Sequence, residues 1–193
     1  MKTALAVIAW LVALPAAAQT LNGFYAGASV GQSEAKSWCS GIDIGASCDD
    51  TSTAWKVFGG YQINRYFAAE AGYARLGKFT ASLGPASDEA KVTAWEAAAL
   101  GIAPLADRLS AFGRLGLYRA TVKETTNFAG NFDNDNNDLT FGAGLAYQFT
   151  AHFGLRGEWQ RYRNVGGGDV ALGAGEGQKS NVDVFSIGAL WRF

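Results

Sequence analysis

Eight segments of the chain, each about ten residues long, alternate between apolar side chains and small or polar ones. They cover residues 23–32, 53–62, 67–76, 92–104, 109–120, 139–149, 153–162 and 182–193. In the sixth segment, Phe141, Ala143 and Leu145 would share one face of a strand, while Gly142 and Gly144 share the other. Because side chains of a strand point alternately to its two faces, this period of two predicts β-structure with one apolar face.

The connections between these segments are of two kinds. Three are short, at residues 63–66, 105–108 and 150–152, and four are long and polar, at residues 33–52, 77–91, 121–138 and 163–181. Short turns at one end and long loops at the other are typical of outer-membrane barrels. A soluble antiparallel sheet also alternates, but here aromatic residues cluster at the strand ends of the apolar face. The sequence therefore predicts an all-β fold, an eight-stranded antiparallel up-and-down transmembrane β-barrel.

The composition excludes several other classes of protein. The chain has 25 glycines among 193 residues, which is unfavourable for a helical bundle. Its most apolar stretch outside the N-terminus, residues 95–106, is interrupted by Glu96 and Pro104, so no helical membrane span is expected there. The net charge of −1 leaves no basic face for nucleic acid.

The first 18 residues have the pattern of a signal peptide. Lys2 is followed by an apolar run, Ala4 to Leu14, and then by three alanines at 16–18 that suit cleavage. The run is shorter than the roughly 20 residues of a spanning helix. We therefore expect residues 1–18 to be a leader, residues 19–193 to be the barrel domain, and the protein to lie in the bacterial outer membrane.

The two cysteines, Cys39 and Cys48, follow the leader and lie in the first predicted loop. Export places them in an oxidising compartment, so we expect them to form a disulfide. His152 is the one histidine and is far away in sequence, which argues against a metal site. The acidic run 133–138 does not follow the spacing of a calcium loop, because Asp138 and Gly144 stand where glycine and glutamate are needed. No cofactor or metal is expected.

The fourth segment does not follow the pattern cleanly. Trp95 and Leu100 both look lipid-facing, yet they are an odd number of residues apart. Either a β-bulge lies between them or Trp95 points inward, and the sequence leaves both alternatives open.

The end of the chain carries a specific pattern. Ser186, Gly188, Trp191 and Phe193 place a polar residue, a glycine and two alternate aromatics in the last strand. This looks like the assembly signal that the barrel-insertion machinery recognises, and we expect that machinery to be a partner during biogenesis.

At this point the sequence resembles the OmpA-like transmembrane domain family. The resemblance rests on three blocks, which lie at residues 58–66 with 70–77, at 104–107 with 113–116, and at 141–159. It implies an eight-stranded barrel with inward charges at Glu70, Arg114, Arg156 and Glu158. Two positions depart from the family pattern: Ala146 replaces an interior carboxylate, and an interior lysine is missing near Leu100, for which Lys56 is a candidate substitute. No peptidoglycan-binding domain follows Phe193, so we expect a role close to that of small stand-alone barrels.

The interior charges have two interpretations. They could line a narrow ion pathway or form a structural ion-pair network, and an eight-stranded barrel is about wide enough for its own side chains to fill. We favour the network, because an unpaired charge in a dry interior is costly. We therefore expect Glu70 to pair with at least one of Arg114, Arg156 or Lys56, and Glu158 to belong to the same network.

The predicted function is a structural and surface-interaction role, in envelope integrity or adhesion, through four extracellular loops. Outer-membrane lipid and lipopolysaccharide are expected partners, together with a host or cell-surface ligand. The alternative is a narrow or gated small-solute channel. A third hypothesis, a lipid A-modifying enzyme, is disfavoured because His152 lies in a predicted periplasmic turn and no serine near the outer rim pairs with it. We therefore expect a protein that is not an enzyme.

Overall fold

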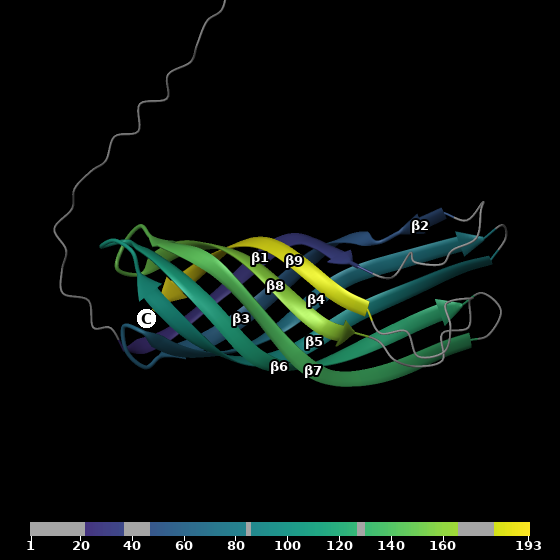
Figure 1. The fold of residues 1–193 in the computed structure, drawn as a ribbon, viewed down its shortest axis with the longest axis horizontal. Coiled ribbons are helices and arrows are strands. Elements are labelled where there is room, and N and C mark those ends of the chain that lie inside the picture. The colour runs from purple at the N-terminus through teal and green to yellow at the C-terminus, as the bar shows by residue number, and fades with distance from the viewer. Residues whose placement is uncertain (1–21, 37–46, 84–85, 127–129, 166–179) are drawn as a thin grey trace, which may run out of the picture.

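The computed structural model describes residues 22–36, 47–83, 86–126, 130–165 and 180–193, which form one antiparallel sheet. Its strands are β1 (Gly23–Ala35), β2 (Ser47–Asp49), β3 (Thr51–Gln62), β4 (Phe67–Leu83), β5 (Ala86–Pro104), β6 (Leu109–Thr126), β7 (Gly130–Gln148), β8 (Phe153–Val165) and β9 (Ser180–Arg192). Successive long strands pair with each other, and β1 pairs with β9, so the sheet closes on itself (Figure 1). The predicted eight-stranded barrel is confirmed, and the short β2 is added beside the far end of β4.

The three short connections are tight turns held by local hydrogen bonds. Asn64 Oδ1 accepts hydrogen bonds from the backbone N–H groups of Tyr66 and Phe67 at 2.8 and 2.9 Å. Thr150 Oγ1 accepts in the same way from His152 and Phe153, at 3.3 and 2.9 Å. Asn and Thr side chains favour such turns because they can bond to the backbone a few residues on. These turns lie at the end of the barrel where β9 finishes, here called the turn end; the opposite end is the loop end (Figure 1).

Two of the four predicted long loops are mostly strand. The β4–β5 pairing continues to Leu83 opposite Ala86, and the β6–β7 pairing continues to Thr126 opposite Gly130. The expectation of loops over residues 77–91 and 121–138 is therefore wrong. Polar residues can continue a backbone ladder once a strand has left the apolar layer, so a change of composition does not mark the end of a strand.

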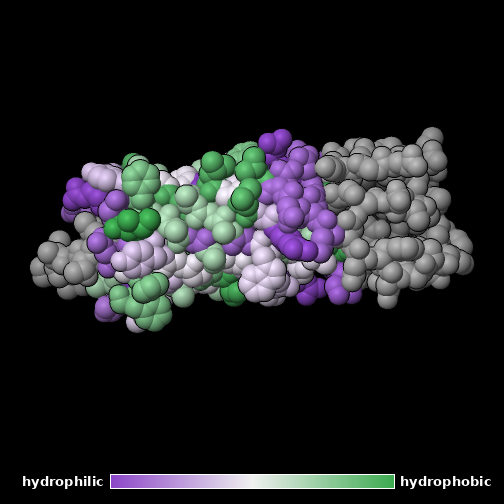
Figure 2. Space-filling view, turned by 90° about the horizontal axis from the view of Figure 1, so that it is seen from below, coloured by the Kyte–Doolittle hydropathy of each residue, from purple (hydrophilic) through white to green (hydrophobic). Residues whose placement is uncertain are grey.

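The outer surface has an apolar band between two sets of aromatic residues. At the turn end, Tyr66 and Phe67 are exposed, and the rings of Tyr147 and Phe149 pack edge to face. Toward the loop end the rings of Trp55, Tyr73 and Trp95 follow one another across β3, β4 and β5, with centroids 5.8 and 4.9 Å apart. Figure 2 shows apolar surface bounded on the loop side by a hydrophilic band. Such girdles mark the two interfaces of a membrane.

The fourth long strand, β5, corrects the sequence interpretation. Trp95 faces outward with 68% of its surface exposed, whereas Leu100 faces the interior with 4% exposed. The pairing of β5 with β4 is regular from Thr93 to Gly101, so no bulge separates the two residues. The assignment of Leu100 to the lipid face is wrong. It packs instead into an apolar cluster inside the barrel, and the regular alternation turns Glu96 inward as well.

The one bulge of the β4–β5 pair lies in β4, between Arg75 and Gly77. Gly77 has a φ of +122°, a conformation that only glycine adopts readily. A Cβ there would also lie 2.4 Å from Cβ of Ser52. The bulge therefore requires glycine both for its backbone angle and for the close approach of β3.

Inside the barrel, the side chains form three layers along the axis. Near the turn end is an apolar layer that includes Tyr25, Phe58, Ala98, Leu100, Phe112 and Leu190. Near the loop end is a second apolar layer, which includes Ala54, Leu76, Ala94, Tyr118, Tyr162 and Val182. Buried charged residues lie between them, as β3 illustrates with Phe58, Lys56 and Ala54 at alternate positions.

Candidate functional site: the charged layer of the lumen

Six charged side chains from five strands meet in the middle of the lumen. They are Lys56 on β3, Glu70 on β4, Glu96 on β5, Arg114 on β6, and Arg156 and Glu158 on β8. Each is buried, because it occupies an inward position of a strand whose neighbouring residues point to lipid. Three cations face three carboxylates, so the layer is neutral when all six groups are charged.

Glu158 is the centre of this layer because it contacts all three cations. Its Oε1 lies 2.6 Å from Arg114 Nη1 and 3.2 Å from Lys56 Nζ. Its Oε2 lies 2.5 Å from Arg156 Nη2. A buried carboxylate that accepts several charge-assisted hydrogen bonds recovers part of the cost of leaving water.

Each of the other two carboxylates shares cations with Glu158. Glu70 lies 2.6 Å from Arg156 and 4.0 Å from Arg114. Glu96 lies 2.8 Å from Arg114 and 3.6 Å from Lys56. The structure thus brings together the five residues expected inside the barrel. Glu70 pairs with Arg156, and Lys56 pairs with Glu158 and Glu96.

Neutral polar side chains complete the hydrogen bonding of the layer. Gln160 accepts from Lys56 at 2.8 Å and donates to Glu96 at 2.7 Å. The hydroxyls of Tyr25 and Tyr162 donate to Glu70 and Glu96 at 2.9 and 2.7 Å. These tyrosines belong to the two apolar layers, so each joins an apolar layer to the charged one.

The Arg156 guanidinium lies between two aromatic rings. Its central carbon is 4.3 Å from the ring centre of Phe58 and 4.9 Å from that of Phe112, distances that allow cation–π attraction. Each ring lies over a glycine of the neighbouring strand, Gly27 or Gly144. A Cβ at either glycine would come within 2.5 Å of the ring. The small residues of the inner face therefore make room for the rings that hold Arg156.

Several members of the layer were missed from sequence. Glu96 is the most important, and its inward position follows from the outward position of Trp95 one residue earlier. Gln160 shares the inner face of β8 with Glu158 and Arg156, but its uncharged side chain did not indicate a place in an ion-pair network. Tyr25 alternates with the outward Phe24 on β1, but alternation does not show that its hydroxyl meets Glu70.

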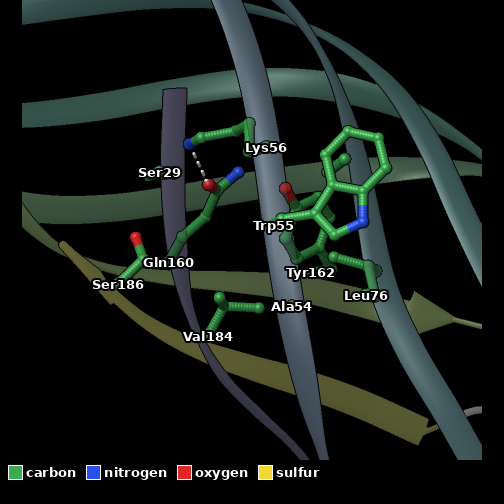
Figure 3. A pocket seen from close by; sticks show the side chains of 10 residues that line it. Ser29, Ala54, Trp55, Lys56, Leu76, Gln160, Tyr162, Val184 and Ser186 are labelled. Atoms are coloured by element: carbon green, nitrogen blue, oxygen red, sulfur yellow. Dashed lines mark hydrogen bonds between the residues drawn. The ribbon is translucent and has the colours of Figure 1, made fainter. Parts of the chain in front are cut away.

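A small cavity lies on the loop side of the charged layer (Figure 3). It measures about 10 Å³ and is lined by side chains that include Ser29, Lys56, Gln160 and Tyr162. The Ser29 hydroxyl is buried and has no hydrogen-bond partner among the described residues. The space suits about one water molecule, which is too little for a solute.

The remaining predicted residues lie outside this layer. Cys39, and the side chain of Cys48, fall outside the described part of the chain, so their disulfide stays a prediction. Ser186 and Gly188 face inward on β9, while Trp191 and Phe193 are exposed at its turn end. His152 lies in the β7–β8 turn with its ring 5.6 Å from that of Trp191. Among the described residues, no group of His, Cys, Asp and Glu could hold a metal, and no helix could cross a membrane.

A closed antiparallel barrel with an apolar outer band, aromatic girdles and a charged lumen defines the class of integral outer-membrane barrels. The chain belongs to the OmpA-like transmembrane domain family, whose model matches residues 19–193. It is therefore an integral protein of the bacterial outer membrane.

Comparison with known proteins supports the same assignment. The chain is 28% identical to outer membrane protein A of Salmonella typhi and to that of Shigella dysenteriae, over 206 aligned residues in each case. The alignments cover all of this chain and 55% of each relative, so the chain spans about half the length of the curated relatives it matches.

Two solved structures share the fold. Ail of Yersinia pestis, in complex with the heparin analogue sucrose octasulfate, has a TM-score of 0.55 at 14% identity, over 89% of this chain and 99% of that one. Neisserial surface protein A has a TM-score of 0.58 at 18% identity, over 89% and 97%. At such identities the likeness concerns the fold alone.

Proposed function

We propose that this protein is a closed barrel that anchors extracellular strands and loops for surface interactions. Its role would be in envelope integrity or adhesion, through contacts with lipopolysaccharide, host surfaces or neighbouring cells. The observation that carries this proposal is the neutral ion-pair layer enclosed between two apolar layers of the lumen. A lumen filled in this way stabilises the barrel and leaves little room for a solute to pass.

The loop end of the barrel supports a role at the cell surface. Strands β4 to β7 continue well past Trp95, as far as Leu83 and Ala86 in one hairpin and Thr126 and Gly130 in the other. Because Ail was solved with a heparin analogue bound, we infer that sulfated glycans are one class of ligand to test on this chain.

Export and assembly would follow the usual route for such barrels. We infer that residues 1–18 are removed as a leader and that Ser186, Gly188, Trp191 and Phe193 are recognised by the barrel-assembly machinery. We also infer that Cys39 and Cys48 form a disulfide that restrains the first loop. Reducing it should leave the barrel folded, since the loop lies outside the ladder between β1 and β3.

The surface role is tested by deleting the gene and restoring it in two forms. One form is the natural chain, and the other has residues 79–90 and 124–134 each replaced by a four-residue turn, which keeps the paired strands within the membrane. We expect the natural chain to restore adhesion or envelope integrity and the shortened barrel to fail, although it reaches the membrane. Equal restoration by both forms would contradict a role for these hairpins.

A narrow channel is the alternative function, and the polar character of the middle layer favours it. Planar-bilayer recording separates the two, with an open general porin as the positive control. We expect no sustained conductance from the natural chain, because the apolar layers on both sides exclude hydrated ions. Steady openings at low voltage would support the channel instead.

We propose no enzymatic role. Acyl transfer requires a nucleophile with a base in reach, and His152 lies at the turn end, in the β7–β8 turn. The relatives of the chain are OmpA-like barrel proteins.

A further inference from the structure

Basic residues gather on the outer face of β4, β5 and β6, on the loop side of the aromatic rings of Tyr73 and Trp95. Backbone pairing places Lys78 opposite Lys91, and Lys91 opposite Lys123. Lys78 and Lys123 are exposed, and Lys91 is partly exposed. Lysines from three neighbouring strands therefore form one row across the outer wall, called the lysine row below.

Arg75 lies between this row and the aromatic rings. It pairs with Trp55 on β3 and with Thr93 on β5, and it is partly exposed on the outer face. Within the described residues, no hydrogen bond or ion pair holds its guanidinium. A guanidinium presents a planar fork of donors that matches two oxygens of a phosphate group.

Two other cations of the outer wall are held by an acid of the neighbouring strand. Arg161 donates two hydrogen bonds of 2.6 Å to Asp183. Arg119 lies 2.8 Å from Asp135. Arg119 and Thr121 of β6 donate hydrogen bonds to the Asp135 carboxylate, and these bonds lower its pKa. The carboxylate is therefore held by β6 and does not pair with Arg75.

In the lysine row, like charges stand directly opposite each other, an arrangement that disfavours pairing in a sheet. Each ammonium group has three donors, so a partner already bound to one of them leaves donors for a further anion. An anion bound from outside would relieve the repulsion between the three lysines.

We propose that Arg75 and the lysine row form a binding site for the phosphate groups of lipopolysaccharide in the outer leaflet. The site lies just beyond the aromatic girdle, which is the level of lipid headgroups. Arg75 binds one phosphate through two donors, while Lys78, Lys91 and Lys123 act as point charges above it. The proposal gives the suggested contact with lipopolysaccharide a place on the barrel wall and does not depend on adhesion by the loops.

The test uses the full mature chain in detergent micelles, titrated with diphosphorylated lipid A and followed by native mass spectrometry. Each basic group near an anionic lipid surface contributes roughly a fivefold change in affinity. We expect Arg75→Gln to weaken binding by about that factor, and the combined change Lys78→Gln, Lys91→Gln, Lys123→Gln by roughly a hundredfold. Dephosphorylated lipid A should bind weakly to every form, with no difference between them.

Arg163→Gln is the matched control, because Arg163 is an exposed arginine on β8, away from the site. We expect it to bind diphosphorylated lipid A as the natural chain does. Gel migration with and without boiling verifies that each variant is folded. If the triple variant does not fold, the single Arg75→Gln variant and the salt dependence of its binding decide the question.

Three results would overturn the proposal. These are unchanged binding by Arg75→Gln, an equal loss in Arg163→Gln, or an equal loss for dephosphorylated lipid A. Since the assay contains no cells, a failure of the adhesion proposal would leave these measurements unchanged.

Discussion

Replacing Glu158 with glutamine is expected to lower the free energy of unfolding of the barrel by about 3–5 kcal/mol, the usual cost of breaking a buried ion pair. Glu158 contacts Lys56, Arg114 and Arg156, and only 1% of its side chain is exposed. Glutamine has nearly the same shape, so the substitution removes a charge without opening a cavity. Three cations would then share two carboxylates in a lumen closed by apolar layers.

Urea unfolding in lipid vesicles, followed by gel migration of unheated samples, measures this effect. Asp135→Asn is the matched control, because it removes a carboxylate from an exposed ion pair with Arg119 and should change stability little. Adding Lys56→Met to Glu158→Gln restores the balance of charge, so the double variant should be more stable than Glu158→Gln alone. If Glu158→Gln costs no more than Asp135→Asn, the charged layer is hydrated and the closed lumen is wrong.

The fold could be predicted from sequence because a membrane barrel imposes one simple rule on every strand. Lipid on one face and a narrow lumen on the other force side chains to alternate, as Phe24 and Tyr25 do on β1. That rule ceases to apply where a strand leaves the membrane. In the sequence the far ends of β5 to β7 are mostly polar, so their pairing could not be told from a loop.

The charged layer was also predictable in part. The family resemblance implies that Glu70, Arg114, Arg156 and Glu158 point inward, but it does not show which groups meet across the lumen. The central position of Glu158 depends on how the strands are placed along the barrel axis, since its three partners come from β3, β6 and β8.

Glu96 was missed because an apolar residue can face either side of this barrel. Leu100 was judged by hydrophobicity and placed on the lipid face, which put it in conflict with Trp95. The interior, however, has apolar layers above and below its charges, and Leu100 belongs to one of them. A large aromatic residue such as Trp95 therefore indicates which face of a strand points to lipid better than an aliphatic residue does. With Trp95 outward, Glu96 would have been assigned to the inner face.

Deleting Phe193 is expected to reduce the amount of barrel in the outer membrane sharply while changing the stability of the folded barrel by only about 1 kcal/mol. In the structure 78% of the Phe193 surface is exposed, and its backbone N–H donates one hydrogen bond of 3.0 Å to the carbonyl of Phe24. The residue thus contributes little to the finished barrel. A strong effect on assembly would have to arise earlier, when the last strand is recognised by the assembly machinery.

Two measurements separate recognition from stability: the amount of heat-modifiable protein in cell membranes, and the yield of refolding from urea into detergent. The deletion should lower the first and leave the second nearly unchanged. Phe67→Ala is the matched control, because Phe67 is an exposed girdle aromatic at the same end, with 58% of its surface exposed, but lies far from the C-terminus. It should leave both measurements close to those of the natural chain. Normal membrane levels of the truncated chain would show that Phe193 is an ordinary girdle residue, and an equal loss in both assays would assign its role to stability.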